Sequence, residues 1–485
     1  TQYPKLYFHK LNPPQREDEL IFGGDPTPRR YIGAYLTEDE RFLVISAANT
    51  TSGNELYIQD LNDGKSEIVN VVNNFEKENS IVDNDGDKLF IYTNLNAPNY
   101  RVVTADVKAP QPANWNDLIP ETENVLTVSR GGSKLFANYL KDATSLVKQF
   151  DRNGKEERTI ELPGIGAASD FEAKREEKDL YYSFTSYIFP ATIFKYDIAS
   201  GKSAIYKKPA ILFNPEDYES KQVFYASKDG TKVPMIITHK KGLVLNGSNP
   251  TMLYGYGGFN VNLTPSFSVS NILLLEQGGV YAVANLRGGG EYGEKWHIAG
   301  TKLKKQNVFD DFIAAAEYLI KENYTSKEKL AISGGSNGGL LVGAAMTQQP
   351  DLFKVAFPAV GVLDMLRYHK FTAGAGWAYD YGTADDNKEM FEYLYKYSPY
   401  HALTKDVNYP ATMVTTADHD DRVVPAHSFK YAARLQEYNK GEHPVLIRIE
   451  TKAGHGAGRP TAMIIQEQAD KWAFMFQNMG IGYKE

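Results

Sequence analysis

The fold of this chain is decided by the stretch Ala331-Ile-Ser-Gly-Gly-Ser336-Asn-Gly-Gly339. It contains the pattern Gly334-x-Ser336-x-Gly338, with an apolar strand pattern before it and a helical pattern after it. In that setting, small residues allow a sharp strand-to-helix turn that projects the Ser hydroxyl at the helix N-terminus. Gly-rich turns also occur simply to pack a helix on a sheet. The strand before and the helix after favour the other interpretation, in which Ser336 is a nucleophile.

Strands and helices alternate on both sides of this turn, from about Glu219 to the C-terminus. The pattern predicts strands at 251–256, 280–285, 329–333, 355–359, 411–416 and 445–450, and helices at 308–322, 338–348, 427–437 and 461–478. Such alternation is typical of βαβ units, with helices on both faces of a parallel sheet. We therefore predict an α/β-hydrolase domain with a doubly wound, mostly parallel sheet over residues 213–485. Its active site should lie in the loops that follow the strands.

A serine nucleophile needs a general base and a carboxylate, in the chain order Ser, Asp or Glu, His. His455 is the histidine that follows Ser336 in a Gly-rich loop between a predicted strand and a predicted helix. Asp418, Asp420 and Asp421 follow the preceding strand. Asp418 also suits a loop cap, and spacing does not choose between the other two.

An oxyanion hole requires two donors. One is expected to be the backbone N–H of Asn337, the residue after the nucleophile. The second is expected from the Gly-rich loop Leu253-Tyr-Gly-Tyr-Gly-Gly-Phe-Asn260, where a Tyr hydroxyl could donate. A Gly-rich strand end would look the same, but its coincidence with the other two loops favours a site.

A repeat occupies the first two hundred residues. Its strand pattern recurs at Phe42, Leu89, Leu135 and Leu180, which are 47, 46 and 45 residues apart. A second pattern ends each time in an aspartate, at Asp60, Asp106, Asp151 and Asp197. Short strands at this period indicate the four-stranded blades of a β-propeller, with an irregular β-sandwich as the alternative. Leu6-Tyr-Phe-His9 matches part of one unit, so we expect an incomplete stretch of propeller over residues 1–212, which starts within a blade.

Composition limits the partners. The net charge of −7 disfavours binding to nucleic acid or to an anionic membrane surface. No apolar run approaches the length of a membrane helix, and the absence of Cys excludes disulfides and thiolate metal sites. We expect no metal and no organic cofactor, and a soluble protein of the cytoplasm or, in a bacterium, of the periplasm.

Six stretches together resemble one known family. They are Tyr254-Gly-Tyr-Gly-Gly-Phe-Asn260, Asn285-Leu-Arg-Gly-Gly-Gly-Glu-Tyr-Gly293, Gly334-Gly-Ser-Asn-Gly-Gly339, Trp377-Ala-Tyr-Asp-Tyr-Gly382, Asp418-His-Asp-Asp-Arg-Val-Val-Pro425 and Ala453-Gly-His-Gly-Ala-Gly458. In combination they resemble the prolyl oligopeptidase family of serine peptidases. That family has a longer chain with more blades, so the resemblance implies that this chain is a C-terminal portion.

The resemblance implies a serine endopeptidase that cleaves short proline-containing peptides after proline. It assigns Ser336, Asp420 and His455 to the catalytic triad, and the Tyr256 hydroxyl and the Asn337 N–H to the oxyanion hole. Arg422 would hold a substrate carbonyl. The proline pocket would consist of Phe259, Trp377 and Tyr381, completed by Val362 and Val423.

Two other functions remain as alternatives. One is a related oligopeptidase or esterase of other specificity, which would use the same triad without preferring proline. The other is an inactive interaction module built on the propeller, although an intact triad argues against it. We expect a monomer, or a chain associated with its own N-terminal portion.

Overall fold

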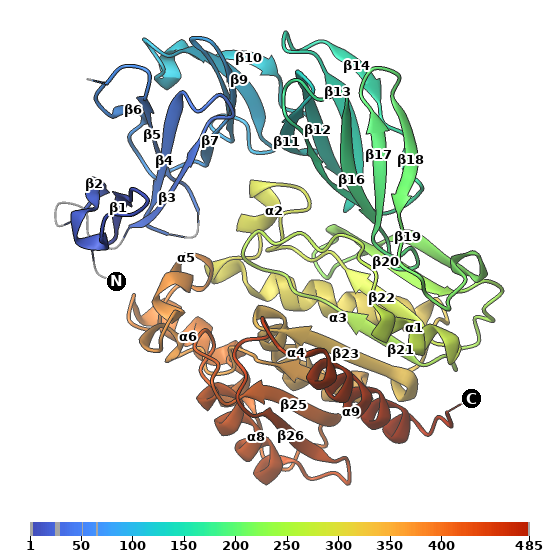
Figure 1. Cartoon of the computed structure of the whole chain (residues 1–485). Coiled ribbons are helices and arrows are strands. Elements are labelled where there is room, and N and C mark those ends of the chain that lie inside the picture. Colours follow the sequence, from blue (N-terminus) through green and yellow to red (C-terminus); the bar gives the residue numbers. More distant parts are fainter. Residues whose placement is uncertain (1–2, 25–29, 51, 65, 484–485) are drawn as a thin grey trace.

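The repeat forms four antiparallel sheets of four strands each, which confirms the predicted propeller blades. The computed structural model describes residues 3–24, 30–50, 52–64 and 66–483. The four sheets are, in chain order, β3 (Tyr31–Leu36), β4 (Phe42–Ala48), β5 (Glu55–Asp60) and β6 (Val69–Val72); β7 (Asn79–Asp85), β8 (Lys88–Thr93), β9 (Arg101–Asp106) and β10 (Asn116–Ile119); β11 (Val125–Gly131), β12 (Lys134–Lys141), β13 (Thr144–Phe150) and β14 (Glu156–Thr159); and β15 (Ala167–Glu172), β16 (Asp179–Thr185), β17 (Thr192–Asp197) and β18 (Lys202–Lys207). The predicted partial unit is a hairpin of β1 (Lys5–Phe8) and β2 (Glu19–Gly23). The blades lie side by side on one side of the C-terminal domain (Figure 1).

The aspartate that closes each repeat has a local structural role. Each of the four carboxylates accepts a backbone N–H two or three residues further along, namely Asp60 from Asn62 (3.0 Å), Asp106 from Lys108 (2.8 Å), Asp151 from Asn153 (2.8 Å) and Asp197 from Ser200 (2.6 Å). The bonds of Asp60, Asp106 and Asp151 form Asx turns, and that of Asp197 spans one residue more. All four close the connection to the outer strand of the blade. The repeated aspartate is therefore explained by the turn that follows the third strand.

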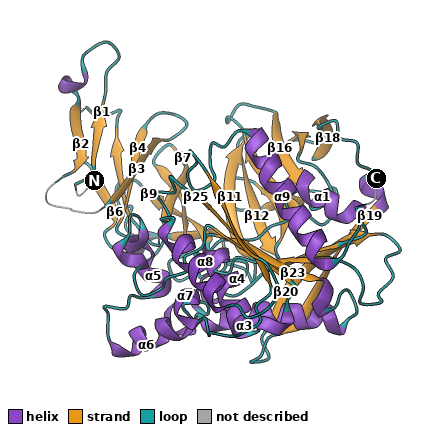
Figure 2. Cartoon of the chain, turned by 90° about the horizontal axis from the view of Figure 1, so that it is seen from below, coloured by secondary structure: helices purple, strands orange, loops and turns teal. Residues whose placement is uncertain are grey.

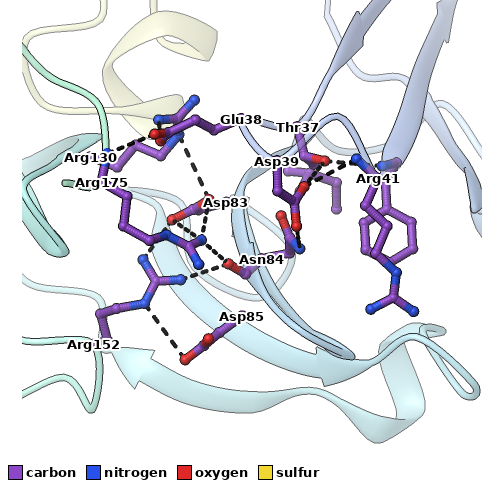
Figure 3. A network of polar contacts seen from close by, with 12 residues as sticks. Thr37, Glu38, Asp39, Arg41, Asp83, Asn84, Asp85, Arg130, Arg152 and Arg175 are labelled. Atoms are coloured by element: carbon purple, nitrogen blue, oxygen red, sulfur yellow. Dashed lines mark hydrogen bonds and ion pairs between the residues drawn. The ribbon is translucent and has the colours of Figure 1, made fainter. Parts of the chain in front are cut away.

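A polar network joins all four blades (Figure 3). Asp83 is only 2% exposed, and its carboxylate receives Arg152 at 2.6 Å and Arg175 at 3.3 Å. Glu38 of the first blade pairs with Arg130 of the third, and it accepts the backbone N–H of Arg175 at 2.6 Å. The network thus links residues at the ends of the first strands of the four blades with Arg152, which follows the third strand of its blade. Apolar side chains fill the space between neighbouring sheets.

The C-terminal domain is built on one sheet of eight strands, which confirms the α/β-hydrolase class. The strands are β19 (Tyr218–Ala226), β20 (Lys232–Lys240), β21 (Thr251–Tyr254), β22 (Val280–Ala284), β23 (Leu330–Gly335), β24 (Val355–Ala359), β25 (Ala411–Ala417) and β26 (Val445–Glu450). Their order is β19-β20-β22-β21-β23-β24-β25-β26, and all pairings from β22 to β26 are parallel. The carboxyl ends of the parallel strands therefore share one edge, where their loops meet.

Helices cover both faces of this sheet (Figure 2). One face packs against α3 (Gln306–Lys321), α4 (Asn337–Gln348) and α8 (Ala426–Tyr438), and the other against α1 (Val269–Glu276) and α9 (Thr461–Met479). Side chains alternate accordingly, since Val355 and Phe357 of β24 join the α9 cluster and Ala356 joins the opposite one. Four short helices complete the domain: α2 (Glu294–Ile298), α5 (Ala378–Tyr381), α6 (Lys388–Tyr397) and α7 (Pro399–Ala402).

The last blade ends at Lys207 and the large sheet begins at Tyr218. We propose that the domain boundary lies in the connecting residues 208–217. The domains also touch through the loop after β22 and the start of α2. Tyr292 of the loop donates to Asp142 at 2.8 Å, and Glu294 of α2 pairs with Lys77 at 2.7 Å. Within the described ranges, no helix combines the length and apolarity that crossing a bilayer requires.

Candidate active site

The predicted nucleophile lies in a strained turn between β23 and α4. Ser336 has φ 59° and ψ −116°, a conformation that costs a non-Gly residue about 1–3 kcal/mol and is characteristic of functional sites. Its backbone N–H donates to the Ala359 carbonyl at 2.9 Å. A Cβ added to Gly334 would lie 2.4 Å from the Gly338 carbonyl oxygen, so only glycine allows the chain to approach itself this closely. The local sequence therefore produces the elbow that its pattern predicted.

The structure brings His455 and Asp420 together from two loops. His455 Nδ1 lies 2.7 Å from Asp420 Oδ2, and the Asp420 side chain is fully buried. The other carboxylate oxygen accepts the backbone N–H groups of Arg422 (3.0 Å) and Val423 (2.9 Å). These bonds fix the carboxylate in one orientation, so that it can hold the imidazole in a defined tautomer.

Asp418 and Asp421, the two other candidates, make different contacts from Asp420. Asp418 accepts from the backbone N–H of Lys452 at 2.7 Å and pairs with His419 at 2.6 Å, as a loop cap would. Asp421 is exposed to solvent. Among the three aspartates that follow β25, Asp420 is the one that contacts His455.

The Gly-rich loop after β21 lies against the N-terminus of α4. The Tyr256 hydroxyl interacts with the Ser336 side chain, and burial raises the pKa of Tyr256 to about 12, although the nearby positive charge of Arg422 opposes this rise. The hydroxyl therefore stays protonated near neutral pH and can donate. Asn337 is the first residue of α4, where the backbone N–H has no acceptor within the helix. Its side-chain amide donates to the Tyr256 carbonyl, which ties the loop to the helix.

The aromatic residues predicted for the pocket form a connected series. The rings of Phe259 and Tyr381 meet edge to face with centroids 5.3 Å apart. Tyr368 contacts Tyr381 edge to face at 5.2 Å and stacks on Trp377 at 6.2 Å. Val362 and Val423, both 2% exposed, belong to the same apolar cluster, whereas the Arg422 side chain is exposed. Tyr368 was missed by the sequence analysis, because one more tyrosine in a Tyr-rich chain carries no signal.

A buried carboxylate next to these aromatic residues was also missed. Asp380, 1% exposed, accepts the backbone N–H of Phe259 at 2.6 Å and contacts the buried His297 Nε2 at 3.2 Å. Phe259 has φ 56°, so this bond holds a left-handed residue in place. Asp380 lies inside the stretch Trp377-Ala-Tyr-Asp-Tyr-Gly382, where a carboxylate among aromatic residues could have indicated it.

Comparisons with known proteins agree over the whole chain. Residues 1–209 match the N-terminal β-propeller domain of prolyl oligopeptidase, and residues 265–482 match the prolyl oligopeptidase family. A prolyl endopeptidase from Elizabethkingia meningoseptica is 60% identical over 481 residues, which cover 99% of this chain and 68% of that protein. One from Dictyostelium discoideum is 41% identical over 98% of this chain and 66% of its own length.

Solved structures show the same arrangement. A structure from a study of two prolyl endopeptidases superposes with a TM-score of 0.94 at 43% identity, over 99% of this chain and 71% of its own. Prolyl oligopeptidase B from Galerina marginata, bound to a peptide substrate, also reaches 0.94 at 36% identity, over 99% and 69%. This chain belongs to the prolyl oligopeptidase family.

Proposed function

We propose that this chain is a serine endopeptidase that hydrolyses short peptides on the carboxyl side of proline, with Ser336, Asp420 and His455 as its triad. The observation that carries the proposal is the 2.7 Å contact between His455 Nδ1 and the buried Asp420, in a domain that also presents Ser336 at a strained elbow. The relatives that match at 60% identity are prolyl endopeptidases, which supports the same chemistry.

The reaction follows from the roles of these groups. Asp420 accepts the Nδ1–H of His455, so Nε2 is the nitrogen free to take the proton from Ser336. The Ser336 oxygen then attacks the peptide carbonyl carbon, and the resulting oxyanion is stabilised by the Tyr256 hydroxyl and the Asn337 N–H. His455 returns its proton to the leaving amine as the C–N bond breaks. Water attacks the acyl-enzyme by the same route and regenerates Ser336.

The aromatic series explains a preference for proline. The proline side chain is a compact apolar ring with no backbone N–H to satisfy, so it fits a site that offers faces and edges of rings and no acceptor. Phe259 and Trp377 are partly buried and would offer such surfaces, backed by the buried ring of Tyr381 and by Val362 and Val423 of the same apolar cluster. We propose that Arg422, which is exposed beside Asp420, donates to a substrate carbonyl on the N-terminal side of the proline.

The test compares two chromogenic peptides that differ only in proline or alanine at the cleaved residue, with Ser336→Ala as the blank. We expect turnover of the proline peptide, much weaker turnover of the alanine peptide, and none in the variant. A fluorophosphonate should label the unmodified chain at Ser336 and leave Ser336→Ala unlabelled.

Equal turnover of both peptides would contradict the proline pocket and favour an oligopeptidase or esterase of other specificity. Absence of both turnover and labelling would contradict the triad.

A further inference from the structure

One buried cation lies beside the proposed oxyanion hole without belonging to the triad or to the aromatic pocket. Lys305 is 1% exposed and sits at the start of α3. Its ammonium group donates to the Gly257 carbonyl at 2.8 Å and to Asn337 Oδ1 at 3.1 Å. Lysine is seldom fully buried, and burial without an ion-pair partner at contact distance is costly, so this position calls for an explanation.

The partners of Lys305 are the two segments that would donate to the oxyanion. Gly257 follows Tyr256 directly in the loop after β21, and Asn337 opens α4 next to Ser336. The two segments are also bonded to each other, because the Asn337 amide donates to the Tyr256 carbonyl. Lys305 thus closes a small ring of hydrogen bonds in which the amide is held from both sides.

The same ammonium group reaches the aromatic pocket. It lies 5.4 Å from the centre of the Tyr381 ring, and the Tyr381 hydroxyl donates to Asn337 Oδ1 at 2.8 Å, the oxygen that Lys305 also contacts. The cation therefore contacts a ring of the pocket and both segments of the oxyanion hole at once. Gly258 completes the packing, since a Cβ there would lie 2.7 Å from the Asn337 amide nitrogen.

We propose that Lys305 is a positioning residue of the oxyanion hole, whose ammonium group sets the geometry of the Tyr256–Gly257 segment and of Asn337 and supplies a positive charge beside them. This inference rests on the proposed function. A fixed positive charge in a buried site favours the negative charge that develops only in the transition state, and it requires little reorganisation when the reaction occurs. Its loss should therefore lower kcat more than it changes KM.

The protonation state of this group gives a second readout. The titratable groups around it are Asp380 and Tyr381 of α5, His297 of α2, which contacts the Asp380 carboxylate, and Tyr393 of α6. Burial lowers the pKa of Lys305 to about 8, although the negative charge of Asp380 acts in the opposite direction. The ammonium is thus present at neutral pH and is lost as the pH rises through about 8, so kcat should fall there.

The experiment measures kcat and KM on the proline peptide between pH 6 and pH 10 for the unmodified chain and for Lys305→Met, Lys305→Arg and Lys471→Met. Lys471 is the matched control, because burial lowers its pKa to about 8 as well. It lies in α9, on the opposite face of the sheet, and its ammonium donates to Ser333 Oγ at 2.9 Å. We expect Lys305→Met to lower kcat about 10–100-fold with KM changed less than about threefold. Its profile should lose the decline near pH 8, which Lys471→Met should retain.

Lys305→Arg keeps a charge that does not titrate in this range, so it should retain more activity than Lys305→Met and should also lose the decline near pH 8. This variant decides the matter if Lys305→Met fails to fold, which far-ultraviolet circular dichroism would show. The inference is overturned if Lys305→Met keeps kcat within about twofold of the unmodified chain, or if the alkaline decline persists in Lys305→Arg. If the unmodified chain itself shows no turnover, the proposed function fails instead.

Discussion

The blades and the hydrolase site both bury charged side chains, but they neutralise them in different ways. In the propeller, Asp83 is surrounded by arginines of other blades, so that opposite charges compensate one another (Figure 3). In the site, Asp420 and Asp380 accept backbone N–H groups and contact a histidine, and Lys305 donates to carbonyl oxygens. The difference indicates that the buried charges of the blades stabilise the assembly of sheets, whereas those of the site hold backbone and rings in a reactive geometry.

The largest effect on kcat is expected from a substitution in the proposed triad. Asp420→Asn replaces an acceptor by an amide that can no longer hold the required tautomer of His455, so kcat should fall about 10⁴-fold. The change is measured as turnover of the proline peptide at pH 7. Asp418→Asn is the control, because Asp418 caps a loop, and it should change kcat by less than about threefold. A comparable loss in both variants would contradict the assignment of Asp420.

A smaller effect is expected from removing one oxyanion donor. Tyr256→Phe deletes the hydroxyl and leaves the ring in place, so kcat should fall about 10²–10³-fold with little change in KM. Tyr254→Phe removes the hydroxyl of a partly buried tyrosine two residues away and should leave kcat nearly unchanged. Steady-state kinetics of the two variants test this pair, and an unchanged kcat in Tyr256→Phe would assign the second donor to another group.

The role of the buried charge in the propeller is tested by the free energy of unfolding, with kcat as the control. Asp83→Asn leaves three arginines without their shared carboxylate, and because these are partly exposed we expect a loss of about 1–3 kcal/mol in the free energy of unfolding. Thermal or urea unfolding measures this loss, and kcat on the proline peptide should stay within about twofold. Asp85→Asn, which removes a more exposed partner of Arg152, should have almost no effect. A drop in kcat without a drop in stability would contradict the structural role.

The last effect concerns the pH dependence of stability and arises from Glu291, in the loop that reaches the propeller. Burial raises the pKa of Glu291 to about 7, while the Leu263 N–H and Asn285 amide that it accepts act in the opposite direction. Between pH 4.5 and pH 7 the folded chain therefore binds more protons than the unfolded chain, so this group lowers stability as the pH rises. Glu291→Gln should remove that dependence, so its free energy of unfolding relative to the unmodified chain should rise by roughly 2–3 kcal/mol between pH 5 and pH 8. Parallel curves of stability against pH for the unmodified chain and for Glu291→Gln would contradict this role of Glu291.

Much of the fold was predictable because its signals are local. The elbow needs only small residues around Ser336 between a strand and a helix. The blade repeat is visible in the sequence because each turn after a third strand uses an aspartate. The predicted strands and helices of the hydrolase domain agree with the observed ones within about two residues, since each has an apolar pattern of its own. Five α-helices of the described chain were not predicted. Three of them, α2, α5 and α7, have only four or five residues, α1 is apolar with little periodicity, and α6 lies in a segment rich in Tyr.

By itself, the sequence determined the class of both domains, the turn at Ser336, the choice of His455 and a short set of aspartate candidates, because these depend on neighbouring residues. The spacing left the aspartate open and the family resemblance implied Asp420, which the tertiary structure places in contact with His455. Only the tertiary structure showed that Tyr368, Asp380 and Lys305 contact the predicted site residues. The contacts made by Asp420, Asp380 and Lys305 join residues 32 to 121 positions apart in the chain. They exist because parallel strands bring their carboxyl ends to one edge of the sheet, and packing at that edge buries some polar groups and leaves others in water.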